Sequence, residues 1–220
     1  MVINITPYSG LQWSDFWYVL DGAWRTVMLT IVSGAAGTLI GLVLGWAREN
    51  SVILRYGLAL YVDVTRSVPL IIQFILVNSV FSIFGLPLTP LEVGLLTLSL
   101  YMGVQTSELV RAGIRSVPEQ LQKAARSLGM NYWQVQTHIT APLAIRTIFP
   151  SWIGTLIGLT KDTALVSVVG YIELLRAAQI VINRSNETLL ILIGVGVFYF
   201  IICYPVSLYG RRLERRLAHD

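Results

Sequence analysis

The chain has 220 residues, of which 55% are hydrophobic and only 13% are charged, and its mean hydropathy is +0.67. A soluble domain usually carries about 25% charged residues, so this composition excludes a protein whose surface mainly faces water. The net charge of +4 is interpreted as a signal of membrane topology, with some attraction to anionic lipid headgroups, and not as a nucleic-acid-binding footprint.

The N-terminal stretch, residues 1–24, contains no Lys or Arg ahead of the first apolar run. It therefore lacks the charged region of a cleavable signal peptide, and we expect it to be retained. The first apolar run covers Thr26–Ala47, and Gly37, Gly41 and Gly45 recur at every fourth position within it. Such a bare helix face permits close approach of a helix from a second subunit or from this chain, although glycine is also simply frequent in membrane helices.

Four further apolar runs follow. Ser67–Leu91 and Thr188–Gly210, like the first run, match the roughly 20 residues that a helix needs to cross a hydrocarbon core. Val93–Ser107 and Thr147–Thr160 are shorter, and we expect each to extend over a neighbouring charge that faces the bundle interior or snorkels. The sequence therefore predicts an all-α, polytopic membrane helix bundle with about five transmembrane helices.

The basic residues predict the orientation, because cytoplasmic segments of membrane proteins carry an excess of Lys and Arg. Basic residues follow the first run, separate the third run from the fourth, and follow the last: Arg48, Arg55, Arg111, Arg115, Lys123, Arg126, Arg146, Arg211, Arg212, Arg215 and Arg216. We therefore expect the N-terminus outside and the C-terminus in the cytoplasm. The expected organisation is an extracytoplasmic segment 1–23, a transmembrane domain 24–212 and a cytoplasmic tail 213–220.

The stretch 127–145 also lacks charge, but it holds too many polar side chains to be buried in lipid, so it is not predicted to span the membrane. Pro118–Leu128 is predicted to form a short helix that Gly129 ends. A second short helix, Tyr132–Thr140, is expected to end before Pro142. This cytoplasmic helical loop, about residues 115–146, has a shape suited to contact another protein.

The sequence offers no visible machinery for catalysis. A phosphate-binding loop needs a Gly-rich turn before a Lys, but Lys123 follows Gln122 and Lys161 follows Thr160. The two histidines are far apart in sequence and have no cysteine partner nearby, so a His/Cys metal site is not expected. We therefore expect no catalytic residues, no metal site and no cofactor in this chain, and an energy source that lies elsewhere.

The residues of the cytoplasmic loop resemble a known motif. Lys-Ala-Ala-Arg-Ser-Leu-Gly at 123–129, followed after nine residues by Ile-Thr-Ala-Pro at 139–142, is similar to the EAA loop of ATP-binding-cassette (ABC) importer permeases. The spacing of that family is kept, but Lys123 stands where Glu is usual and Ala141 where Leu is usual. The resemblance implies a contact with an ATPase subunit through Lys123, Ala124, Ala125, Ser127, Leu128, Gly129, Ile139 and Pro142.

Three further blocks are similar to permeases of the polar amino acid (histidine/glutamate/glutamine/arginine-type) transporter family: Arg66–Leu70, Glu108–Ile114, and Lys161–Ser167 with Glu173-Leu174. The similarity runs from about residue 22 to residue 212. The chain departs from the usual residues at Gln105, Gln120, Leu121 and Ala164, which makes it a divergent member.

The resemblance implies the transmembrane permease subunit of an ATP-driven importer of polar amino acids or related small solutes, in the bacterial inner (plasma) membrane. The implied partners are ABC ATPase subunits that bind ATP and magnesium, a second permease subunit that is identical or paralogous, an extracytoplasmic solute-binding protein, the amino acid substrate and membrane lipid. No nucleic acid partner is expected.

Polar residues near the apolar runs are candidates for a substrate pathway, because such residues in membranes mark pathways or pairs. The set is Arg66, Gln73, Gln105, Glu108, Lys161, Asp162 and Thr163. Each has a simpler alternative: snorkelling for Arg66, an intrahelical pair of Glu108 with Arg111, a structural pair of Lys161 with Asp162, or helix-to-helix hydrogen bonds for the glutamines.

Two other classes of protein compete with the importer permease. A secondary transporter or channel driven by an ion gradient would work without an ATPase and usually shows an inverted repeat, which this sequence lacks. An integral membrane enzyme would need an acid, base, metal or nucleophile constellation, and none is visible.

Overall fold

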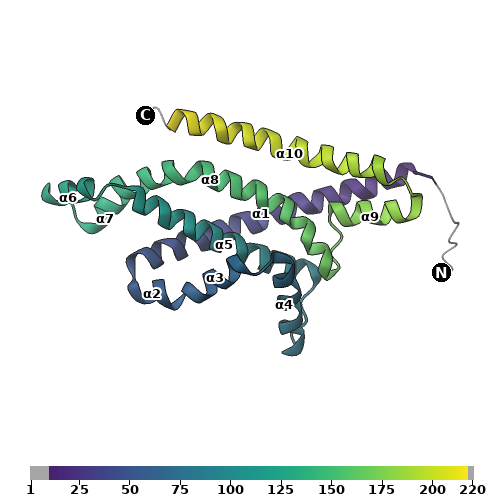
Figure 1. Ribbon diagram of the computed structural model, residues 1–220, viewed down its shortest axis with the longest axis horizontal. Coiled ribbons are helices and arrows are strands. Elements are labelled where there is room, and N and C mark those ends of the chain that lie inside the picture. Colours follow the sequence, from purple (N-terminus) through teal and green to yellow (C-terminus); the bar gives the residue numbers. More distant parts are fainter. Residues whose placement is uncertain (1–9, 218–220) are drawn as a thin grey trace.

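The computed structural model describes residues 10–217, and this part of the chain is helical with no strand. Four long helices run along the long axis of the molecule (Figure 1): α1 (Trp13–Asn50), α5 (Pro90–Ser116), α8 (Ala141–Asp162) and α10 (Thr188–Leu217). The 38 residues of α1 give a length of about 57 Å, more than a hydrocarbon core requires. The predicted class, an all-α membrane helix bundle, is confirmed.

The shorter elements lie at the ends and along one side of this bundle. They are α2 (Val52–Gly57), α3 (Ala59–Ser67), α4 (Leu70–Ile83), α6 (Glu119–Ser127), α7 (Tyr132–Val135), the π-helix η1 (Gln136–Thr140), the 3-10 helix η2 (Thr163–Val169) and α9 (Leu174–Ser185). The helices α6 and α7 lie at the same end as the last turns of α10, while α9 lies with the beginning of α1 at the other end (Figure 1). The coupling segments and the last turns of α10, which carry many of the basic residues, therefore gather at one end, and the orientation in the membrane stays a prediction.

Three helices are long and apolar enough to cross a membrane: α1, the continuous helix Tyr132–Val169, and α10. A fourth span results if the bent pair Val52–Ser67 and Leu70–Ile83 counts as one crossing. The helix α5 has 27 residues and continues past Ser107 over Glu108, as expected for a span extended across a charge. The number five stays a prediction.

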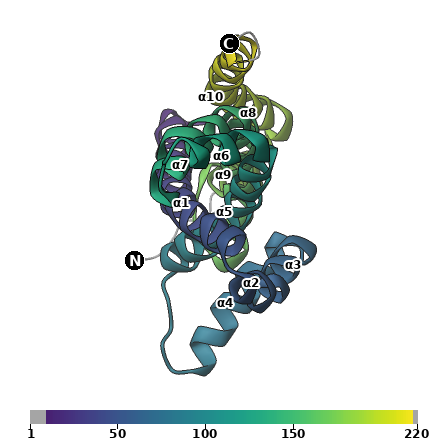
Figure 2. The ribbon, with the colours of Figure 1, turned by 90° about the vertical axis from the view of Figure 1, so that its left-hand side faces the viewer.

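The prediction of one straight span over Ser67–Leu91 is wrong. The chain turns by 116° between α3 and α4, and α4 has only 14 residues before Gly85 adopts a left-handed conformation. Pro69 causes the break, because proline disfavours a helical residue before it and begins the next helix instead. As a result, α4 projects away from the long helices (Figure 2).

The prediction that a second short helix ends before Pro142 is also wrong, because the chain stays helical from Tyr132 to Asp162. Proline inside an α-helix collides with the carbonyl four residues earlier and cannot donate to it. Here the π-helix η1 directly precedes Pro142, and the N–H of Ala141 donates to the carbonyl of Gln136, five residues earlier. This wider turn accommodates the proline ring where the sequence rule expects a stop.

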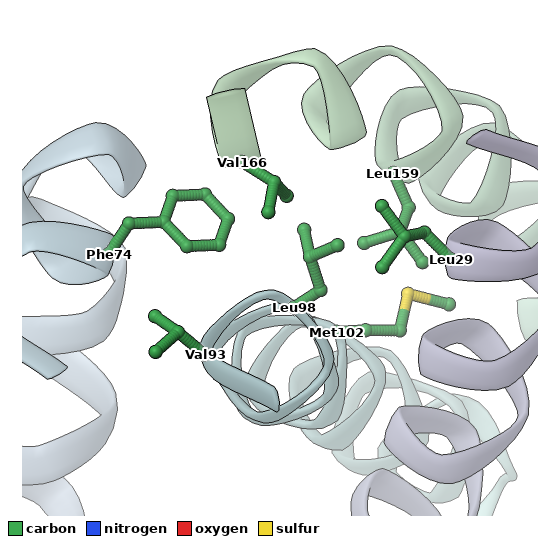
Figure 3. Close-up of a cluster of buried hydrophobic side chains, with 7 residues drawn as sticks. All are labelled: Leu29, Phe74, Val93, Leu98, Met102, Leu159 and Val166. Atoms are coloured by element: carbon green, nitrogen blue, oxygen red, sulfur yellow. The ribbon is translucent and has the colours of Figure 1, made fainter. Parts of the chain in front are cut away.

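The main core forms where α4 and η2 meet the long helices. Leu29 of α1, Phe74 of α4, Leu98 and Met102 of α5, and Val166 of η2 are all fully buried there, together with Val93 and Leu159 (Figure 3). Burial of Phe74 against this cluster fixes the base of α4 to the bundle, although most of α4 projects outward.

The glycine face of α1 packs within the chain, against α5. A Cβ atom added to Gly37, Gly41 or Gly45 would lie 2.7 Å from a backbone carbonyl oxygen of α5, a distance that such atoms do not tolerate. Only glycine therefore permits this approach of the two backbones. Of the interpretations open from the sequence, the seam between helices of one chain is the one that the structure adopts.

Candidate functional site

The coupling element, defined here as residues 118–142, leaves the bundle after α5 and returns to it through α8. Its first helix, α6, begins after Pro118 and buries one residue, Ala125, which is 4% exposed. Lys123 Nζ donates to Glu119 Oε2 at 2.7 Å along the exposed side of the same helix. This hydrogen bond lowers the pKa of Glu119, so the unusual Lys123 already has a carboxylate neighbour inside its own helix.

The turn after α6 depends on Gly129. Its φ of +86° is the left-handed conformation in which glycine commonly follows a helix. The N–H of Gly129 donates to the carbonyl of Arg126 at 3.0 Å, and the N–H of Met130 donates to that of Ala125 at 3.2 Å. Nothing lies within 4 Å of a Cβ atom added here, so the backbone conformation, not lack of space, requires glycine.

The residues predicted to contact an ATPase form a largely accessible surface on this element. Lys123, Ala124, Ser127, Leu128, Gly129 and Pro142 are exposed, Ile139 is half-buried, and Ala125 is buried. Leu128 stands out, because 85% of its surface is accessible although it is a large apolar residue. Leu128 therefore gives the turn after α6 an apolar side chain that a partner protein could cover.

Side chains also connect the coupling element to the end of α1. The indole rings of Trp133 and Trp46 stack with their centroids 5.7 Å apart and their planes 21° from parallel. The hydroxyl of Tyr132 donates to Oδ1 of Asn50 beside them. A capping box between Asn131 and Gln134 begins α7 and holds these aromatic residues in helical register.

A network of arginines and glutamates joins α1 to α5 near this end of the bundle. Arg48 Nη1 donates to Glu108 Oε1 at 2.6 Å, and Arg111 Nη1 donates to the same oxygen at 3.0 Å. Arg111 also lies 3.4 Å from Glu49, which accepts from Arg115 at 2.9 Å. The side chain of Arg48 is only 4% exposed, so its charge depends on a nearby carboxylate.

Two of the predicted pathway residues belong to this network. Glu108 makes the predicted intrahelical pair with Arg111, and Arg66 Nη1 lies 3.6 Å from its second oxygen. Because Arg66 is half exposed, its contribution to folding is small, and it remains available to other partners.

The two glutamines have local hydrogen-bond partners. Gln73 Nε2 donates to the carbonyls of Thr65 and Val68, both at 2.8 Å, and so satisfies the backbone where α3 breaks before α4. Gln105 Nε2 donates to the hydroxyl of Tyr101 at 3.1 Å. Gln73 is therefore used to stabilise the bend, which the sequence alone did not indicate.

Lys161, Asp162 and Thr163 mark the point where α8 changes into η2. Thr163 is fully buried and donates to the carbonyl of Thr160 at 2.7 Å. Among the ion pairs formed within residues 10–217, none joins Lys161 to Asp162, so the structural pair considered from the sequence is not seen. Neighbours in a helical sequence point in different directions, which explains why they do not meet.

Glu173, which belongs to a block similar to polar amino acid permeases but was not predicted as a site residue, is a fully buried carboxylate. It caps α9 by accepting from the N–H groups of Leu175 and Arg176, both at 2.8 Å. Thr26 of α1 accepts from the N–H of Leu174 at 3.2 Å, so the beginning of α9 is fixed to α1. No sequence signal indicated this cap, because Ser, Thr, Asp and Asn are the usual residues at that position and Glu is not.

Comparison with known proteins gives one consistent family. A family model described as "Binding-protein-dependent transport system inner membrane component" matches residues 37–219. The chain is 35% identical to the L-cystine transport system permease protein TcyB of Bacillus subtilis, covering 96% of this chain and 91% of that protein. It is 30% identical to the glutamine transport system permease protein GlnP of Escherichia coli, covering 94% and 97%.

A solved structure shares the fold as well. It is described as an amino acid ABC transporter with histidines, and it superimposes with a TM-score of 0.83 at 28% identity, covering 90% of this chain and 94% of that one.

Proposed function

We propose that this chain, which belongs to the family of binding-protein-dependent transport system inner membrane components, imports polar amino acids or related small solutes as the permease of an ATP-driven ABC transporter. The observation that carries the proposal is the coupling element. It is a helical unit with an exposed apolar tip at Leu128, and it is inserted between two long helices of the bundle.

The substrate class is inferred from the relatives. Permeases for cystine and for glutamine match this chain over nearly its whole length. A solute with an ammonium and a carboxylate group requires partners of both signs, and Arg66, Lys161 and Asp162 supply such charges beside the apolar segments. Gln105 on α5 is half-buried and offers a neutral hydrogen-bonding group, whereas Thr163 is fully buried and would act only by holding the start of η2 in place.

ATP hydrolysis is assigned to separate ATPase subunits that bind ATP and magnesium. Two permease subunits, identical or paralogous, would enclose the pathway, and an extracytoplasmic binding protein would deliver the solute. Closure of the ATPase pair would displace the coupling element. Because this element is continuous with α5 and α8, its displacement would shift both helices and switch access between the two sides of the membrane.

Co-purification of the tagged chain with an ATPase from native membranes tests this proposal. Leu128→Arg is the informative variant, because it changes the exposed tip and leaves the buried Ala125 intact. The matched control is Leu86→Arg, since Leu86 is 64% exposed and lies between α4 and α5. We expect the wild type and Leu86→Arg to recover the ATPase and Leu128→Arg to lose it.

The opposite result is equally clear. A chain that purifies without an ATPase and moves L-glutamine, L-arginine or L-cystine into liposomes under an ion gradient alone would be a secondary transporter, and the proposal would be wrong.

A further inference from the structure

We infer that Trp46, Asn50, Tyr132 and Trp133 form an aromatic clamp that positions the coupling element during the transport cycle. The inference rests on the proposed function, and it assigns these four side chains the task of transmitting movement from the coupling element to α1. None of them is among the residues inferred to contact the ATPase, which lie in Lys123–Gly129 and at Ile139 and Pro142.

The need for a clamp follows from how the coupling element is attached. It joins the bundle through two covalent connections, one after α5 and one into α8, and the second passes through the π-helix η1. A π-turn has wider geometry than an α-helix and is a frequent site of bending. A force applied to α6 could therefore bend the chain at η1 instead of moving the long helices.

The packing behind α7 is only partial. An open groove of about 230 Å³ lies between α7, η1 and the long helices, and Trp46, Val110, Trp133 and Ile148 are among its lining residues. Val135 at the end of α7 is fully buried, but Trp133 is 61% exposed. Specific side-chain contacts on the groove side therefore add to the hold of α7 on the bundle.

The clamp supplies those contacts by connecting α7 to the end of α1, which is distant from α7 in the chain, and so gives the coupling element a third attachment point. Trp133 stacks on Trp46, the hydroxyl of Tyr132 donates to Asn50, and the rings of Tyr132 and Trp133 meet edge to face at 5.5 Å. The first and third are favoured geometries for aromatic pairs. With three attachment points, the coupling element cannot swing on η1 without breaking the stack, so its displacement also moves α1.

Trp133→Ala in the complete transporter tests the inference, with Trp13→Ala as the matched control. Trp13 lies on the same helix as Trp46, is 75% exposed, and stacks on Phe16 at 5.5 Å, but it is at the opposite end of the molecule. Three quantities are measured: recovery of the ATPase, ATP hydrolysis by the purified complex, and cellular uptake of radiolabelled L-cystine, L-glutamine and L-arginine.

For Trp133→Ala we expect unchanged ATPase recovery and hydrolysis, but uptake per ATP lowered by about threefold to tenfold, the range that corresponds to one lost aromatic pair. Trp13→Ala should match the wild type in all three. Unchanged uptake per ATP in Trp133→Ala would overturn the clamp, as would loss of the ATPase itself. Failure of the proposed function looks different, because the wild type would then recover no ATPase at all.

A rescue experiment separates transmission of movement from a merely structural role. Cys203 is the only cysteine, so Cys203→Ser provides a background in which Trp46→Cys and Trp133→Cys can be combined and joined by a short bismaleimide. The unlinked double variant should be uncoupled, and the linked one should recover uptake per ATP. A linked variant that stays uncoupled would show that connecting α7 to α1 is not what the tryptophans provide.

Discussion

Arg48 and Glu108 are 60 residues apart in the chain, and Arg48 Nη1 donates to Glu108 Oε1 at 2.6 Å, from α1 to α5. Glu108 is the only carboxylate within ion-pair distance of Arg48 among residues 10–217. Since Arg48 is almost completely buried, this one contact keeps a buried positive charge compensated.

Replacement of this carboxylate should therefore destabilise the bundle. We expect Glu108→Gln to lower the free energy of unfolding by about 3 kcal/mol, because it leaves the Arg48 charge buried without a counter-ion. Thermal unfolding of the detergent-purified protein measures the change. Glu214→Gln, at an exposed position on α10, is the control, and equal melting temperatures for the two variants would contradict the prediction.

The glycine seam gives a second prediction. Gly41→Ala should lower the free energy of unfolding by about 1–3 kcal/mol, because the new methyl group would lie 2.7 Å from the carbonyl oxygen of Gly103. Gly196→Ala in α10 has open space around it and should be neutral or gain up to about 1 kcal/mol from helix propensity. The two variants can be compared by denaturant titration, and the prediction fails if Gly41→Ala is as stable as Gly196→Ala.

Gly129 provides a prediction about conformation. Its φ of +86° costs a residue with a Cβ atom about 1–2 kcal/mol, less for Asn. We expect ATPase recovery to be highest for the wild type, lower for Gly129→Asn and lower again for Gly129→Ala. The Gly129→Trp variant should recover no more ATPase than Gly129→Ala. Gly57→Ala at the end of α2 is the control, because it also has open space around it but no positive φ. Full recovery with Gly129→Ala would show that the left-handed turn is not required for docking.

Pro142 gives a prediction about the π-helix. Pro142→Ala restores an N–H that can donate to the carbonyl of His138, which favours conversion of η1 to an α-helix and shifts α7 relative to α8 by about one residue. We expect the folded protein to form but ATP-driven uptake to fall. Pro150→Ala, also inside α8, is the control, and hydrogen exchange over residues 136–142 reports the conversion. Unchanged exchange there would contradict the proposed cause of η1.

Much of the fold could be predicted because apolar length and charge are local properties of the sequence. The helix class, the extension of α5 over Glu108, and the short helix ended by Gly129 all follow from residues close together in the chain. The errors arise where tertiary context overrides a local rule. Within the run Ser67–Leu91 the helix begins only after Pro69 and ends before Gly85, and η1 allowed Pro142 inside a continuous helix.

The contacts of the site could be predicted less well, because they join residues that are distant in sequence. The pair of Glu108 with Arg111 follows from helical spacing, but the bond from Arg48 depends on how α1 crosses α5. Likewise, Gln73 was predicted as a pathway residue, because the sequence does not show that the bend between α3 and α4 brings the carbonyls of Thr65 and Val68 within its reach. The ATPase contact and the substrate pathway stay predictions.

The glycine seam also limits where the molecule can deform. Each glycine of the seam on α1 leaves space that one side chain of α5 fills, namely Met102, Thr106 or Val110, so the two helix surfaces interdigitate. Neither helix can slide or rotate past the other without a steric clash with the backbone, so α1 and α5 move as one rigid body. Deformation during a transport cycle is then concentrated outside this pair of helices, above all at the bend between Ser67 and Leu70, because the clamp opposes bending at η1.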